Sequence, residues 1–182
     1  MLSTILEKQP TWIHLRDKHG RIPLHYAASI GYLEVVELLL GICKCCTIQS
    51  DKYGYFPVHL ASSGGHVEVV KKLLEYCPDP TEMLDTVFEQ NILHIAANYG
   101  KQNVIRYIVE SEVHGHSQMI NQKDKNGDTP LHLAARSCHP TTVCYLVNQN
   151  NETALDIVYE LHKSSLGQAS SSIPSQTHKF IS

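Results

Sequence analysis

The sequence has no long hydrophobic run and no excess of positive charge. Its 182 residues include 15 Lys and Arg against 18 Asp and Glu, so it lacks the basic field that binds nucleic acid by counterion release. The longest apolar stretch, residues 35–43, contains Glu37 and is far shorter than the roughly 18 residues that cross a bilayer. Residues 1–7 lack the charged and apolar regions of a signal peptide. We therefore expect a folded cytoplasmic chain that neither binds nucleic acid nor inserts directly into a membrane.

Cysteine is too sparse for a secreted disulfide scaffold, which is usually shorter and denser in cysteine. Three of the six cysteines crowd together as Cys43, Cys45 and Cys46, and the others are scattered. Thiolates are good zinc ligands, but C-x-C-C lacks the usual C-x₂-C pair and has no second pair to match it. The sequence favours reduced structural thiols over a metal site.

No known catalytic pattern is present in the sequence. It contains no G-x-S-x-G, no phosphate-binding loop and no dinucleotide-binding glycine motif. A Cys–His pair could supply a nucleophile, but nothing selects one cysteine. His114 and His116 lie two residues apart in a predicted loop, which is a weak geometry for holding a metal. We predict a protein that is not an enzyme and uses no cofactor, metal or small-molecule substrate.

The chain repeats itself. Four related tetrapeptides occupy residues 22–25, 56–59, 91–94 and 129–132, and their final histidines are 34, 35 and 38 residues apart. Alanine follows each histidine by two positions, and the sixth position is glycine in three repeats and Cys138 in the fourth. Aspartate stands eight positions before the histidine, and glycine five before, in every repeat but the third. A period of this length indicates a repeat architecture.

Each repeat is predicted to consist of a turn, a helix, a second turn and a second helix. Asp-x-x-Gly suits a tight turn, and the proline that follows suits the first turn of a helix. The alanine-rich helix ends near a glycine, and an amphipathic stretch such as residues 33–40 forms the second helix. One such unit has too little apolar surface to fold alone, so neighbouring units must stack.

The period, the tetrapeptide and the alanine pair resemble ankyrin repeats over residues 1–159. The resemblance implies an all-α ankyrin-repeat solenoid of stacked helix-turn-helix units, with hairpin-like turns, here called fingers, projecting beside a groove. We expect one partial repeat, four repeats and a second partial repeat, at residues 1–16, about 17–50, 51–84, 85–123, 124–148 and 149–159. We interpret residues 111–117 as an exposed loop, and we predict a disordered Ser-rich tail at 160–182.

The four histidines of the repeat signature are predicted to be structural: His25, His59, His94 and His132. Because they lie a full repeat apart, they cannot converge on one metal ion. We expect each imidazole to hydrogen-bond backbone or hydroxyl groups across adjacent turns.

In ankyrin folds the finger tips and the ends of the first helices face partners, so the resemblance implies a protein-binding surface. The predicted contacts are Arg21, Tyr53, Tyr55, Phe88, Gln90, Tyr99, Asp128 and Arg136. The middle repeats are aromatic, and tyrosine gives a large contact area at low entropic cost. The alternative is that some rings, Phe88 first among them, pack against the next finger.

Residues 20–28, 90–97 and 124–135 resemble plant ankyrin proteins of the accelerated-cell-death type. In that family the repeats precede a hydrophobic PGG domain that spans the membrane, and the proteins act in defence and stress responses. The resemblance implies a truncated relative of this membrane-anchored family, at the cytosolic face of a membrane if a longer form carries the PGG domain, which the 182 residues lack. A soluble cytosolic adaptor and a poorly folded gene remnant are the alternatives.

Overall fold

The computed structural model describes residues 9–77, 79–111 and 115–150. Every regular element within these ranges is helical, which confirms the all-α prediction. The predicted helix at the start of the first partial repeat, the last partial repeat beyond Asn150 and the Ser-rich tail lie outside the described residues.

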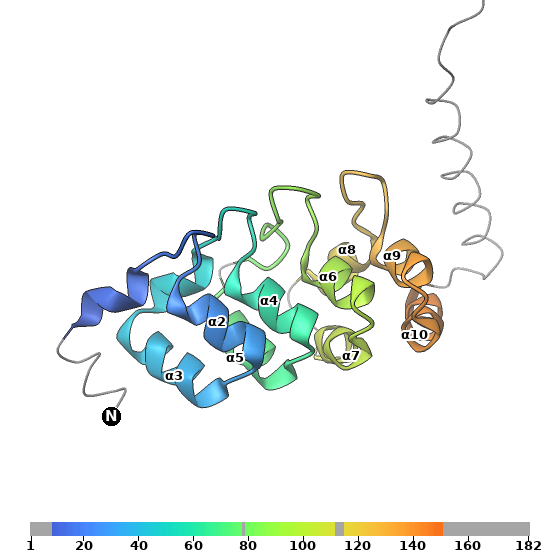
Figure 1. Ribbon diagram of the computed structural model, residues 1–182. Coiled ribbons are helices and arrows are strands. Elements are labelled where there is room, and N and C mark those ends of the chain that lie inside the picture. The colour runs from blue at the N-terminus through green and yellow to red at the C-terminus, as the bar shows by residue number, and fades with distance from the viewer. Residues whose placement is uncertain (1–8, 78, 112–114, 151–182) are drawn as a thin grey trace, which may run out of the picture.

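The described helices form successive pairs, each joined by a short turn (Figure 1). The pairs are α2 (Pro23–Ile30) with α3 (Leu33–Ile42), α4 (Pro57–Gly64) with α5 (Val67–Leu74), α6 (Ile92–Asn98) with α7 (Gln102–Glu110), and α9 (Pro130–Arg136) with α10 (Pro140–Asn150). Two 3₁₀ helices, η1 (Pro10–His14) and η2 (Lys44–Ile48), lie before and after the first pair, and α8 (His116–Asn121) lies between α7 and α9.

The first helix of each repeat begins where the local chemistry favours it. Proline occupies the first turn of α2, α4 and α9, where its missing N–H leaves no hydrogen bond unmade. Helix α6 has no proline and begins instead behind Asn91, whose side-chain oxygen accepts the N–H groups of Leu93 and His94 at 2.9 and 3.1 Å. Asparagine capping therefore replaces proline at this one start.

A residue with left-handed backbone follows each first helix and turns the chain toward the second. The φ angles are +75° at Gly31, +80° at Gly65, +64° at Gly100 and +58° at Cys138. Cys138 breaks the glycine pattern of the sequence but keeps its conformation, so the turn is set by the repeat and not by the residue.

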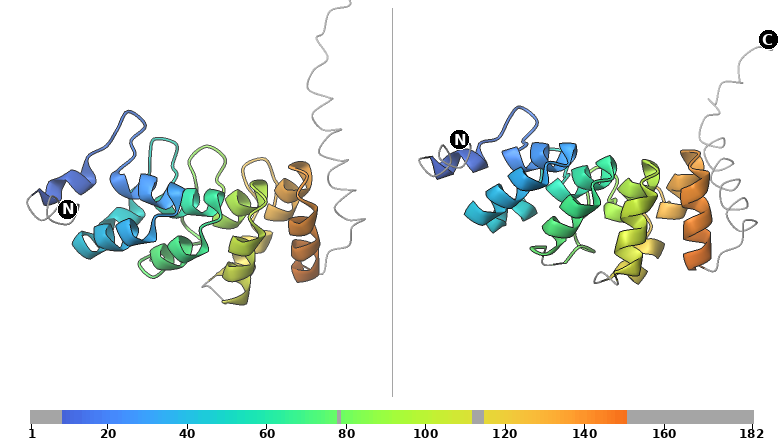
Figure 2. Two further views of the ribbon diagram at one scale, coloured as in Figure 1. Left: turned by 60° about the horizontal axis from the view of Figure 1, so that its bottom comes forward. Right: turned by 90° about the horizontal axis from the view of Figure 1, so that it is seen from below.

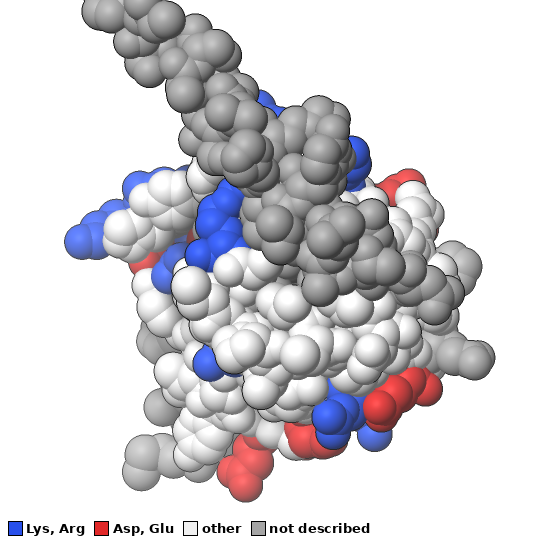
Figure 3. Space-filling model, turned by 90° about the vertical axis from the view of Figure 1, so that its right-hand side faces the viewer, with Lys and Arg blue, Asp and Glu red and all other residues white. Residues whose placement is uncertain are grey.

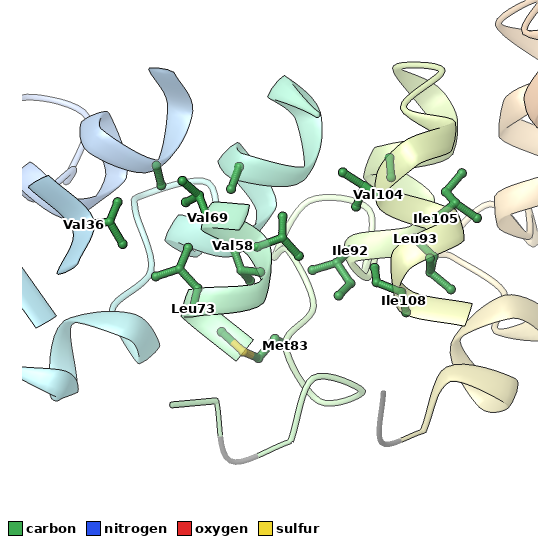
Figure 4. Packing of buried hydrophobic residues seen from close by; sticks show 14 of the residues in the cluster. Val36, Val58, Val69, Leu73, Met83, Ile92, Leu93, Val104, Ile105 and Ile108 are labelled. Atoms are coloured by element: carbon green, nitrogen blue, oxygen red, sulfur yellow. The ribbon is translucent and has the colours of Figure 1, made fainter. Parts of the chain in front are cut away.

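The pairs stack so that the first helices form one row and the second helices form another (Figures 1 and 2). The buried core runs without a break between the rows, from Ile13 in η1 to Leu146 in α10. In the middle of the array, Val58, Leu73 and Ile92 project into the space between successive repeats (Figure 4). Each repeat thus covers the apolar face of its neighbour, as expected for units that cannot fold alone.

The prediction of an exposed loop over residues 111–117 is wrong at its C-terminal end. Helix α8 begins at His116, buries Met119 and Ile120, and packs against α7, α9 and α10. At six residues it is too short to show a 3.6-residue period in the sequence. The extra spacing before the fourth repeat therefore adds to the core.

Ser62 occupies a position that is alanine in the other three repeats, at Ala28, Ala97 and Ala135. Its side chain is fully buried, and its Oγ has no hydrogen-bond partner within the described ranges. An unpaired buried hydroxyl costs about 1–3 kcal/mol, so this serine weakens the junction that the alanine positions build.

Ser62→Ala should raise the free energy of unfolding by about 1 kcal/mol, because it removes the unpaired hydroxyl. Urea unfolding measures the change. The matched control is Ser63→Ala in the same helix, whose hydroxyl donates to the Leu60 carbonyl at 2.8 Å. Both changes raise helix propensity alike, so equal shifts in the two variants would contradict the prediction.

Candidate functional site

The first, second and fourth fingers are each built on an aspartate that caps its own turn. Oδ1 of Asp17 accepts the N–H groups of His19 and Arg21 at 2.9 and 2.8 Å. Asp51 and Asp124 make the same pair of hydrogen bonds to residues two and four positions further on. The glycine of each turn has φ between +76° and +84°, a conformation that costs residues with a Cβ. Each finger is thus a defined local unit.

The third finger carries the same aspartate at a shifted position. Oδ1 of Asp85 accepts the N–H groups of Val87 and Phe88 at 2.9 and 2.8 Å, and its Oδ2 accepts that of Gln90 at 2.9 Å. Glu89 takes the left-handed conformation, with φ of +58°, that glycine has in the other fingers. A fixed count of eight residues back from His94 missed Asp85. Allowing one inserted residue in this turn would have found it.

Glu89→Gly should raise the free energy of unfolding by about 1 kcal/mol, because glycine takes positive φ without a Cβ clash. The greater freedom of glycine in the unfolded chain offsets part of the gain. The matched control is Glu82→Gly, an exposed turn residue outside the positive-φ positions, which should lower stability in the same urea assay. A loss of stability in both variants would show that Glu89 is not strained.

Successive fingers are joined through the backbone and line up along one edge of the array (Figure 1). Three N–H groups donate to carbonyls of the preceding finger: Lys52 to His19 at 3.0 Å, Thr86 to Tyr53 at 3.2 Å, and Lys125 to Phe88 at 2.8 Å. These bonds fix the relative positions of the tips.

The signature histidines join each helix pair to the chain that follows. In three repeats the Nε2 atom donates a hydrogen bond to a backbone carbonyl further along the chain. His25 Nε2 bonds the Tyr55 carbonyl at 2.9 Å, His59 Nε2 bonds the Met83 carbonyl at 3.0 Å, and His94 Nε2 bonds the Asp128 carbonyl at 3.0 Å. In all four, Nδ1 accepts the N–H of the residue three positions earlier. A ring that accepts at Nδ1 and donates from Nε2 is neutral. In the fourth repeat, Nδ1 of His132 also lies 2.8 Å from the Thr129 hydroxyl.

Low pH should destabilise the array through these histidines. Burial lowers the pKa of His25 and His94, and it lowers the pKa of His59 to about 4. In the unfolded chain each has a pKa near 6.5, so below that pH the unfolded state takes up protons first. The histidine contribution to stability is complete above about pH 6.5 and is lost toward pH 4, at up to about 1.4 kcal/mol per pH unit for each histidine.

Urea unfolding at pH 7.5, 6 and 5 measures this slope. His59→Gln keeps a donor near the position of Nε2 but does not titrate. This variant should be less stable than wild type at pH 7.5. Between pH 6 and 5 its free energy of unfolding should fall less steeply, because about one proton fewer is taken up on unfolding. An unchanged slope in His59→Gln would show that other groups cause the acid sensitivity.

Two of the residues four positions before the histidine bond to the next finger. Nε of Arg21 lies 3.0 Å from Oδ2 of the buried Asp51. Nε2 of Gln90 donates to Oδ2 of Asp124 at 2.8 Å, and Gln90 is only 7% exposed. The predicted partner contact at Gln90 is therefore corrected, because its side chain is used between repeats.

Asp128 is likewise withdrawn from the predicted partner contacts. It is buried, and both of its carboxylate oxygens accept hydrogen bonds from the guanidinium of Arg136. The Arg136 side chain is still half exposed. The pair therefore presents a cation, and not an anion, at the surface.

Three aromatic residues remain exposed among the predicted contacts, and we call them the finger surface: Tyr53, 39% exposed; Phe88, 42%; and Tyr99, 55%. Tyr53 is held in place by the His19 ring, which is stacked on it with 6.4 Å between ring centres, and by Lys52 Nζ at 5.1 Å from its centre.

Tyr55 is half-buried, with its ring edge-on to His59 at 6.0 Å. Burial, then Asp85 and Tyr99, raise the pKa of Tyr55. Ile30 is also exposed, at the helix end equivalent to that of Tyr99. Val87 is exposed as well, next to Phe88.

This arrangement suits non-covalent recognition. Exposed aromatic rings and arginine side chains are the residue types that dominate protein interfaces. Seen from the α10 end, charged side chains lie toward the margins of the described surface, whose centre is uncharged (Figure 3). Within the described ranges, each helix is too short or too polar to cross a bilayer.

Stacked helix pairs with a row of projecting fingers define a repeat solenoid that binds along an extended surface. A family model that describes three copies of the ankyrin repeat matches the chain twice, at residues 2–83 and at residues 77–157. The chain therefore belongs to the ankyrin-repeat family, whose members generally serve as protein-interaction modules.

Two curated relatives contain similar repeats. The chain is 37% identical over 76 residues to the putative E3 ubiquitin-protein ligase XBAT31 of Arabidopsis thaliana, covering 38% of this chain and 17% of that protein. It is 30% identical over 138 residues to a transient receptor potential cation channel subfamily A member 1 homolog of Caenorhabditis elegans, covering 76% of this chain and 8% of the channel. The chain thus spans less than a fifth of the length of either relative.

Proposed function

We propose that the chain binds another protein non-covalently through the finger surface, with Tyr53 and Phe88 as its principal contacts. The observation that carries this proposal is that the two exposed rings stand on neighbouring fingers joined by the bond from Thr86 N–H to the Tyr53 carbonyl. Arg136, whose side chain is half exposed, favours a partner that carries carboxylates.

Two features of the site favour binding energy here. The Tyr53 ring is held by His19 and Lys52 before a partner arrives, so little conformational entropy is lost there on association. The finger backbones beneath the two rings are fixed by the backbone N–H groups that donate to Asp51 and Asp85. Such rigid aromatic anchors account for most of the free energy in typical interfaces.

Replacing both Tyr53 and Phe88 by alanine should weaken partner binding by about 1,000-fold, because each ring would lose a contact of the kind worth about 2 kcal/mol. Wild-type and variant chains, immobilised at equal density, are incubated with the same plant-cell extract. Retained proteins are then identified by mass spectrometry and titrated against purified chain to obtain the dissociation constant.

The matched control is Tyr32→Ala, an exposed tyrosine at the turn between α2 and α3, away from the fingers. It should bind as wild type does. Tyr55 is left intact because its ring packs on His59 and its loss would disturb the fold. If the double variant keeps its helical melting curve and still retains the same proteins, the finger surface is not the site.

We also propose a role in plant defence or stress signalling, in the cytosol and without a catalytic step of the chain's own. Support comes from the resemblance of residues 20–28, 90–97 and 124–135 to the membrane-anchored plant family, and from the plant relative at 37% identity. The continuous buried core argues against a poorly folded remnant. Sequencing the transcript at its 3′ end separates the other readings: apolar segments of about 20 residues would support a membrane-anchored form, and their absence a soluble adaptor.

A further inference from the structure

Four metal-ligating side chains meet at the N-terminal end of the array, far from the fingers' aromatic rings. They are His14 at the end of η1, Cys43 at the end of α3, and Cys45 and Cys46 in η2. One ligand atom from each lies within 4.8 Å of all the others. Cys46 is buried, Cys43 is half-buried, and His14 and Cys45 are exposed, so the cluster is anchored in the core and open to solvent on one side.

Backbone and core contacts independent of these side chains bring them together. Ile13, next to His14, is buried in the core, and the Arg16 guanidinium donates to the carbonyls of Gly20 and Ser50 at 2.6 and 2.7 Å. These contacts hold the segment after η1 against the chain that follows η2.

The three cysteines are positioned by the end of α3. The Cys43 N–H makes the last hydrogen bond of that helix, to the Leu39 carbonyl at 3.0 Å, and Cys43 then turns to extended backbone. The following 3₁₀ turn, stabilised by the Thr47 hydroxyl on the Lys44 carbonyl at 2.9 Å, directs Cys46 inward toward His14.

The spacing of one sulfur–nitrogen pair in the cluster fits a tetrahedral zinc ion. Zn–S bonds of about 2.3 Å and Zn–N bonds of about 2.0 Å place a sulfur and a nitrogen ligand about 3.6 Å apart. Cys46 Sγ lies 3.6 Å from His14 Nδ1. Three thiolates and one imidazole form an established donor set for structural zinc, and soft thiolates favour Zn²⁺ over Mg²⁺ or Ca²⁺.

Cys43 and Cys45 are joined by a disulfide in the structure, and a disulfide removes two of the four ligands. We propose that the chain binds one Zn²⁺ through His14, Cys43, Cys45 and Cys46 when this disulfide is reduced. The three thiols release their protons to solvent as the metal–sulfur bonds form. The ion ties η1 to the junction of α3 and η2, and it thereby stabilises the packing of η1 against the first described helix pair.

The test uses the full 182-residue chain reduced with a phosphine, which takes up the oxygen of one water as it converts the disulfide to two thiols. Titration with Co²⁺ should give one equivalent of tetrahedral cobalt, with thiolate-to-cobalt charge-transfer bands, and Zn²⁺ should displace it. Cys45→Ser and His14→Ala should each weaken binding at least about tenfold. Cys144→Ser, a free exposed cysteine in α10, is the matched control and should bind as wild type does.

Zinc should also slow amide exchange across residues 9–15 of the reduced wild-type chain but not of Cys45→Ser. Cys45 and His14 are exposed, so both variants should keep the helical circular-dichroism spectrum of wild type. Failure of the reduced wild-type chain to bind either metal would overturn the proposal, as would a metal affinity that either substitution leaves unchanged. Tight binding with no change in exchange would overturn the stabilisation of η1 by the ion.

Discussion

A buried imidazole in each repeat is the interaction on which the rest of the array depends. Through Nδ1 it holds the start of its own first helix, and in three repeats it reaches through Nε2 to a carbonyl of the next unit. Because one repeat buries too little apolar surface to fold alone, stability exists only where neighbours dock. A hydrogen bond with defined donor and acceptor fixes how they dock, whereas apolar packing alone tolerates sliding. The ring must remain neutral to keep both roles, which makes the stacking of the repeats dependent on pH.

The same geometry decides which finger residues are available to a partner. Each finger aspartate uses Oδ1 for its own turn, and in Asp51 and Asp124 the second oxygen meets Arg21 and Gln90 of the preceding repeat. The position four residues before the histidine is therefore used inside the array. The position six residues before it, occupied by Tyr53 and Phe88, lies in the finger and stays exposed, as the proposed binding requires. The contacts between repeats and the exposed rings thus come from alternate residues of one turn, so the exposed positions can vary without disturbing the stack.

Much of the fold could be predicted from the sequence because its determinants are local. Proline before a helix, a left-handed residue after it and the histidine spacing all act within a few residues of where they are read. The errors came from relations between units. Asp85 was missed because one inserted residue shifts its register, and α8 was missed because its burial depends on α7, α9 and α10. Gln90 and Asp128 were assigned to a partner because family position does not reveal the direction of a side chain.

The metal-ligand cluster of His14 and the three cysteines also depends on contacts between units that local sequence does not reveal. C-x-C-C alone is a poor zinc motif, since a fourth ligand is required and none is near in sequence. The stacking of η1 on the first repeat supplies His14, so the donor set exists only in the folded chain. An ion bound only by the folded state adds its binding free energy to the unit that holds it. That gain falls on the first repeat, whose outer side has η1 in place of a complete helix pair among the described residues. Because the cluster and the finger surface share no residue, loss of metal should weaken the packing of η1 while leaving the finger surface unchanged.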